Sequence, residues 1–99
     1  MKLYEIAHSR TGDKGNISDI SLIAYDPKNY DIIETAVTAE RVKEWFKDMI
    51  HGEVIRYEIP SLGALNFVMY DALGGGVTRS LSLDKHGKGF SSYLLDMEI

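Results

Sequence analysis

The chain contains no cysteine and no long apolar run, and each of these absences excludes certain classes of function. Without cysteine there is no disulfide, no thiolate metal site and no cysteine nucleophile. The formal net charge of −4 argues against nucleic acid or an anionic membrane as the main partner. No apolar stretch approaches the ~20 residues of a membrane span, and no signal-peptide pattern opens the sequence. We therefore expect a cytoplasmic protein that binds neither nucleic acid nor a membrane.

The composition of the chain is typical of a globular protein, and we predict a single domain over residues 1–99. Its 44% hydrophobic and 26% charged residues suffice for a core without disulfides or metal. The three histidines, His8, His51 and His86, have no mutual metal-ligand spacing. We predict neither a metal nor a cofactor.

Hydrophobic patterning in the first half of the chain predicts two strands and then helices. The strands are expected over residues 2–8 and 18–25. Pro27 suits the first turn of a short helix that reaches about Glu34. Thr38 is a good N-cap for the clearest helix in the sequence. The apolar stripe of that helix contains Val42, Trp45, Phe46, Met49 and Ile50.

The second half predicts two more strands and two more helices. Residues 53–59 alternate cleanly, which indicates a half-buried strand with a polar outer face. Residues 62–73 have helical spacing, although a strand over 65–70 stays open because short apolar runs are ambiguous. A helix that is apolar nearly all round needs cover on two sides, so we expect part of it in a subunit interface. A strand over 77–83 and a helix over roughly 88–97 complete the chain.

The predicted order ββαβαβα favours an α+β fold. Four strands with helices on one side pack most economically as a two-layer sandwich of ferredoxin-like character. Its four-stranded sheet would have helices on one face and a polar outer face exposed to solvent.

The polar segment over residues 8–16 is longer and richer in chemistry than a chain reversal requires. The residues Gly12–Gly15 do not match the P-loop pattern. They do not match the GXXG loop of KH domains either, because that loop joins two helices and this segment joins two predicted strands. Two interpretations stay open: glycine amides with two cations bind an anion, or the glycines form a turn capped by Asp13 and Asn16. The candidate ligand-binding residues of this segment are Arg10, Gly12, Lys14, Gly15 and Asn16.

A second glycine-rich stretch occupies residues 74–80. Three consecutive glycines lose much chain entropy on ordering, so the backbone there either ends a helix or approaches a ligand closely. If both glycine-rich stretches meet at one end of the sheet, the site suits a phosphate, a carboxylate or a CoA-type anion. Asn66, in apolar surroundings, must find hydrogen-bond partners and either pins its segment or orients a ligand. The further candidates are Asn66, Gly74, Gly75, Gly76, Thr78 and Arg79.

Catalytic residues are not identified by any motif. His8 ends a predicted strand beside Asp13 and is suited to act as a general acid or base. Nothing fixes a nucleophile beside it, and a hydrogen-bonded structural histidine is the alternative. Whether the chain is an enzyme therefore stays open.

Three motifs resemble one known family: HSRTGDKGN at 8–16, LGALNF at 62–67 and LGGGVTRSL at 73–81. Together with TAERV at 38–42, they are similar to the C-terminal domain of acyclic terpene utilisation protein A (AtuA). Members often have Ala-Arg-Ser where this chain has Ser-Arg-Thr at 9–11. The resemblance implies a ferredoxin-like fold. It also implies an association with the bacterial breakdown of citronellol- or geraniol-type compounds or related branched acyl-CoA acids.

The resemblance supplies no established catalytic residue. It covers nearly the whole chain but not the family's large N-terminal domain, so we expect a homo-oligomer or a larger partner chain equivalent to that domain. The leading hypothesis is an accessory subunit that binds an anionic ligand through the two glycine-rich stretches. The alternatives are a purely structural interaction module that docks through residues 62–73, and a small enzyme that uses His8 and Asp13.

Overall fold

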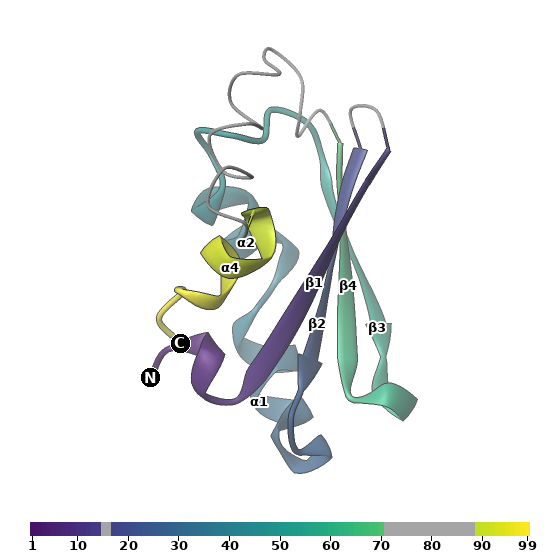
Figure 1. Cartoon of the computed structure of the whole chain (residues 1–99), viewed down its shortest axis with the longest axis vertical. Coiled ribbons are helices and arrows are strands. Elements are labelled where there is room, and N and C mark those ends of the chain that lie inside the picture. The colour runs from purple at the N-terminus through teal and green to yellow at the C-terminus, as the bar shows by residue number, and fades with distance from the viewer. Residues whose placement is uncertain (15–16, 71–88) are drawn as a thin grey trace.

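The computed structural model describes residues 1–14, 17–70 and 89–99. Within them, an antiparallel four-stranded sheet forms one layer and helices form the other (Figure 1). The strands are β1 (Ala7–Lys14), β2 (Ile17–Ala24), β3 (Val54–Ile59) and β4 (Ala64–Tyr70), in the order β1-β2-β4-β3. The helices are α1 (Tyr30–Ala36), α2 (Ala39–Trp45) and α4 (Gly89–Leu95). The predicted α+β sandwich with helices on one face is confirmed.

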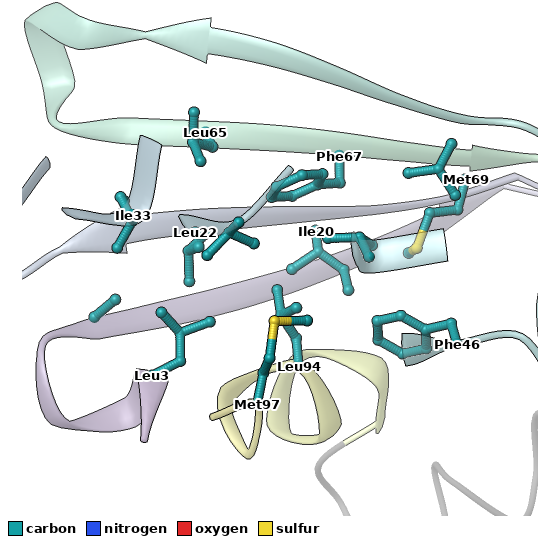
Figure 2. Packing of buried hydrophobic residues seen from close by; sticks show 14 of the residues in the cluster. Leu3, Ile20, Leu22, Ile33, Phe46, Leu65, Phe67, Met69, Leu94 and Met97 are labelled. Carbon is teal, nitrogen blue, oxygen red and sulfur yellow. The ribbon is translucent and has the colours of Figure 1, made fainter. Parts of the chain in front are cut away.

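The core lies between the two layers, on the sheet face that is turned towards the helices (Figure 2). Ile20 and Leu22 of β2 lie opposite Phe67 and Leu65 of β4, and all four side chains are fully buried. Because successive side chains of a strand point to opposite faces, the residues between them lie on the outer face. The helical layer and its connections contribute Ile33, Val37, Val42, Phe46, Ile50 and Leu94 to this core.

Helix α2 begins where the sequence predicts. The hydroxyl oxygen of Thr38 accepts a hydrogen bond of 3.1 Å from the backbone N–H of Arg41, which satisfies one of the free amides of the first turn. The helix ends at Trp45, earlier than the apolar stripe indicates. Phe46 and Ile50 nevertheless stay buried, because the turns that follow keep them against the sheet.

Strand β1 differs from the predicted first strand. Residues 3–5 form a 3-10 turn, and β1 runs through most of the segment that we expected to be a loop. Its polar side chains are compatible with a strand because they find partners on the helix side. The Ser9 hydroxyl donates to the carbonyl of Ser91 in α4 at 2.9 Å, and the Thr11 hydroxyl accepts from the Ser91 N–H at 2.9 Å.

Strand β4 corrects the largest sequence-based expectation. The helix predicted over 62–73 is wrong, and the open alternative, a strand over 65–70, is right. The segment pairs with β2 on one side and β3 on the other, so its backbone hydrogen bonds are satisfied within the sheet. β4 is therefore the fourth strand of the described sheet. The strand predicted over 77–83 lies outside the described residues.

Strand β3 lies where we predicted it, but its two faces are reversed. Val54 and Arg56 are in register with Met69 and Phe67, two fully buried residues of β4. Side chains in register share a face of the sheet, so Val54 and Arg56 point towards the helices. The predicted polar outer face of 53–59 is therefore wrong. The residues that point outward are Ile55, Tyr57 and Ile59.

The hydrogen bonds of Arg56 explain why this charged residue can face the helices. Its guanidinium Nη1 donates to the backbone carbonyls of Glu34 at 2.7 Å and Val37 at 3.0 Å, at the end of α1. These carbonyls have no partner within the helix, and a cation suits the negative end of a helix dipole. Nη2 donates to the carboxylate of Glu58 at 3.1 Å. Arg56 thus ties the edge strand to the helical layer.

Adjacent isoleucines of α1 provide a matched test of this packing. Ile33 is fully buried and Ile32 is 40% exposed. We expect Ile33→Ala to lower the free energy of unfolding by about 2–5 kcal/mol, because it removes buried contacts and leaves a cavity. Ile32→Ala should change it by less than about 1 kcal/mol. Urea denaturation followed by circular dichroism measures both, and equal losses would contradict the layer arrangement.

Candidate functional site

The outer face of the sheet lies opposite the helices (Figure 1), and strand register places His8, Arg10, Gly12 and Asn66 on it. Strand register sorts its outward positions into four rows that cross the strands from β1 to β3. The first row is His8, Ile23, Ala64 and Ile59, and the second is Arg10, Ser21, Asn66 and Tyr57. The third is Gly12, Asp19, Val68 and Ile55, and the fourth is Lys14, Ile17 and Tyr70.

Asn66 and Asp19 form the polar centre of this face. The Asn66 amide Nδ2 donates to the Asp19 carboxylate at 3.1 Å and to the Ser21 hydroxyl oxygen at 3.1 Å. The amide nitrogen of Asn66 therefore has the hydrogen-bond partners that a half-buried donor requires. It also fixes the direction of the Asp19 carboxylate.

Gly12 lies beside this carboxylate. A Cβ built at Gly12 would be only 2.6 Å from the Asp19 carboxylate oxygen Oδ1. Gly12 lies inside β1 and in register with Asp19, so its role is close approach and not a turn. Of the two open interpretations, the turn does not hold for Gly12.

Arg10 and His8 occupy the β1 ends of the second and first rows. Arg10 is exposed, and the next outward position along the strand is Gly12, which leaves space beside the guanidinium. The His8 ring stacks on Tyr25 with a centroid separation of 5.0 Å. Asp13 lies five residues further along the extended strand, about 16 Å between Cα atoms at ~3.3 Å per residue. The structure does not bring His8 and Asp13 together as an acid–base pair.

The other predicted ligand residues are not placed by the structure. Gly15 and Asn16 lie outside the described residues, and so do Gly74, Gly75, Gly76, Thr78 and Arg79; of Lys14, only the backbone is described. The meeting of the two glycine-rich stretches therefore stays a prediction. Among the described residues, no group of three His, Asp or Glu side chains is arranged to hold a metal ion.

The comparison with known families confirms the resemblance of the motifs. A family model, the AtuA ferredoxin-like domain, matches residues 1–99, the whole chain. The chain belongs to this family. No curated protein and no solved structure matched it.

The outer face of this AtuA domain also contains apolar residues that the sequence reasoning missed. Ile17, Tyr57 and Tyr70 are 40%, 51% and 38% exposed. Ile55 and Val68 lie between them in the third row. The alternation of 53–59 contains this signal, but it does not say which side of the strand faces the helices.

Two groups with shifted pKa values lie away from this face. Burial raises the pKa of Tyr30, and the nearby Glu58 carboxylate raises it further, so the phenol stays neutral at physiological pH. A hydrogen bond from the Met1 amino group lowers the pKa of Glu98. Neither group belongs to the candidate site.

A hollow of about 430 Å³ also lies elsewhere, beside α2. It is lined by Glu40, Lys43, Glu44, Lys47, Ile50 and His51, none of which the sequence predicts as a site residue. None of the described helices is long and apolar enough to cross a membrane.

The contact between Gly12 and Asp19 gives a testable prediction. Gly12→Ala should displace the carboxylate and break its hydrogen bond with Asn66, at a cost of about 1–3 kcal/mol in the free energy of unfolding. In an Asp19→Ala background the same change should be neutral or slightly stabilising, because alanine is preferred to glycine inside a strand. A double-mutant cycle by urea denaturation measures the difference. Additive effects would contradict the contact.

Proposed function

We propose that this AtuA domain is an accessory assembly module, whose outer sheet face binds another folded polypeptide. The observation that carries the proposal is the reversed orientation of β3. Its apolar residues Ile55, Tyr57 and Ile59 point away from the helices, while Arg56 points towards them. An exposed apolar patch of this kind is typical of an interaction surface.

The neighbouring strands extend the same patch. Val68 lies between Ile55 and Asp19, and Ile17 and Tyr70 lie side by side in the fourth row. In the part of the chain that the structure describes, no element covers this face (Figure 1). Its exposed tyrosines, Tyr57 and Tyr70, and the exposed Arg10 are of the residue types that dominate binding at protein interfaces.

Family membership supports an AtuA-type context for this module. The matched model is named for a ferredoxin-like domain of AtuA, which favours a neighbouring AtuA domain or a second copy as the other polypeptide. We propose that the assembly serves the breakdown of acyclic terpenoids or related branched acyl-CoA acids. The family resemblance alone supports this part of the proposal.

An anionic ligand is the second candidate occupant of the face. The exposed guanidinium of Arg10 beside Gly12 favours it, since a carboxylate or phosphate could approach there. The Asp19 carboxylate in the adjacent row opposes it, because like charges repel more strongly where water is displaced. The protein interface is therefore the better-supported function.

A charged substitution on β3 tests the interface. We expect Tyr57→Lys to weaken association at least ~10-fold, because it removes an aromatic contact and places a desolvated charge in the interface. Tyr4→Lys is the matched control, since Tyr4 is 52% exposed and lies in the 3-10 turn before β1. Sedimentation measures association of the chain alone and when mixed with the large domain of an AtuA protein.

Equal association of both variants and the wild type would overturn the interface proposal. Calorimetric binding of coenzyme A that is lost in Arg10→Ala and kept in Tyr57→Lys would instead establish the anionic-ligand candidate.

A further inference from the structure

We propose that the outer face binds a second copy of this chain about a two-fold axis that runs perpendicular to the strands. The inference rests on the proposed function and narrows it to one occupant. The axis lies in the plane of the interface, between the second and third rows. Each strand then lies over its own counterpart in the opposite direction. Two sheets packed face to face keep their strand directions within about 30° of each other, which this arrangement permits.

A two-fold rotation about this axis brings opposite charges of the two copies together. The rotation brings the second row of one copy over the third row of the other. Arg10 and Ser21 of one copy then face Gly12 and Asp19 of the other. Gly12 has no side chain and Arg10 is exposed, so the guanidinium has space to reach the Asp19 carboxylate across the interface. Symmetry repeats the contact, so each dimer contains two Arg–Asp pairs.

The Asp19 carboxylate is preorganised for this contact by groups of its own chain. Its Oδ2 accepts from Asn66, while Oδ1 lies against the open backbone of Gly12. The carboxylate therefore keeps a fixed direction before the second copy arrives. Fixing it in advance reduces the entropy that association must offset.

The apolar positions also correspond. The rotation places the first row over the fourth, so Ile23 faces Ile17 and the small Ala64 faces the large Tyr70. Tyr57 comes over Ile55 at the β3 edge. At these three places apolar side chains meet apolar side chains, as a packed interface requires, while on β4 Asn66 of one copy comes over Val68 of the other and keeps the hydrogen bonds of its amide within its own chain.

The other simple two-fold axis is less favourable. An axis parallel to the strands would lay β1 over β3 and β2 over β4, which places Asp19 against Val68 of the other copy. The carboxylate would then be buried without a cation. An unpaired buried charge is costly, so the charges select the perpendicular axis.

The size of the face indicates a weak, transient dimer. Four strands ~4.8 Å apart and seven residues at ~3.3 Å each give a flat footprint of roughly 400 Å². A standard interface buries about 800 Å² of accessible surface on each partner, so this face is at the small end of the range. We expect a dimer that dissociates in the micromolar range.

Exchange of the two charges between copies tests the arrangement. In a dimer of the Arg10→Glu variant, the introduced carboxylate of each copy faces the Asp19 carboxylate of the other. In a dimer of the Asp19→Lys variant, the introduced ammonium of each copy faces the Arg10 guanidinium of the other. Like charges repel, so the dimer of each variant should dissociate at least ~10-fold more readily than that of the wild type. In a one-to-one mixture of the two variants, the introduced carboxylate of one meets the introduced ammonium of the other, and the second pair stays native. Sedimentation equilibrium should show the mixture dimeric again. Circular dichroism checks that each variant is folded.

Engineered cysteines provide a test that leaves the charges intact, since the chain has no cysteine of its own. Facing residues of two packed sheets are ~10 Å apart, too far for a direct disulfide, so a short bifunctional thiol crosslinker is used. In a mixture of Ile17→Cys and Ile23→Cys, the perpendicular axis predicts that the crosslinker joins one variant to the other in preference to two copies of either. Preferential pairing of Ile23→Cys with Ala64→Cys would overturn the axis and support the parallel one.

A wild-type chain that stays monomeric at 100 μM, a concentration roughly 100-fold above a typical micromolar dissociation constant, would overturn the inference. The interface proposal would survive that result if the large AtuA domain still bound the wild type and lost affinity for Tyr57→Lys. A mixture of the charge variants that stays monomeric would also overturn the inference.

Discussion

The pairing of β2 with β4 is the constraint on which both faces of the sheet depend. Ile20 lies opposite Phe67 and Leu22 opposite Leu65, and these four side chains are the support on which the helices pack. A slip of one residue would turn every core side chain of a strand towards solvent. The core therefore fixes which residues lie on the outer face. The positions of Asp19 and Asn66 follow from hydrophobic burial on the other side of the same strands.

Because the buried face fixes the register, it also determines that the outer face has a polar half and an apolar half. The β1 and β2 side carries the hydrogen-bonded polar centre around Asp19, and the β3 side carries aliphatic and aromatic residues. The polar centre is linked by hydrogen bonds, since the amide nitrogen of Asn66 donates both to a carboxylate and to a hydroxyl. A network of this kind is stiff and contributes direction, while the apolar half contributes surface to bury. In the dimer that we propose, the polar half sets the orientation of the two copies and the apolar half is buried between them.

The sequence predicts those elements whose signal is local. Thr38 marks the start of α2 because its hydroxyl bonds to the first turn, and the alternation of β2 shows directly in its burial. The segment 62–73 lacks such a signal, since a short apolar run suits a buried strand as well as a helix. Only its pairing with β2 and β3, which are distant in sequence, decides the outcome. Polar β1 is a strand because it pairs with the adjacent β2 and because Ser9 and Thr11 hydrogen-bond to Ser91 of α4, which is distant in sequence.

The candidate site was predictable in part. Asn66, Arg10 and Gly12 stand out in the sequence, and the structure places all three on one face. The contribution of Asp19 could not be foreseen, because it depends on the register that brings Gly12 opposite it. The apolar half was missed because Arg56 reaches carbonyls at the end of α1, and no periodicity reveals that contact.

The Arg56 anchor has a consequence for how this surface can evolve. It holds the edge strand through the side that faces the helices, so the outward side chains at 55, 57 and 59 carry none of that attachment. Substitutions at these three positions can accumulate without detaching the strand. The side of the strand that holds it to the fold is thereby separate from the side that is open to solvent, so the outward surface can change while the attachment stays the same.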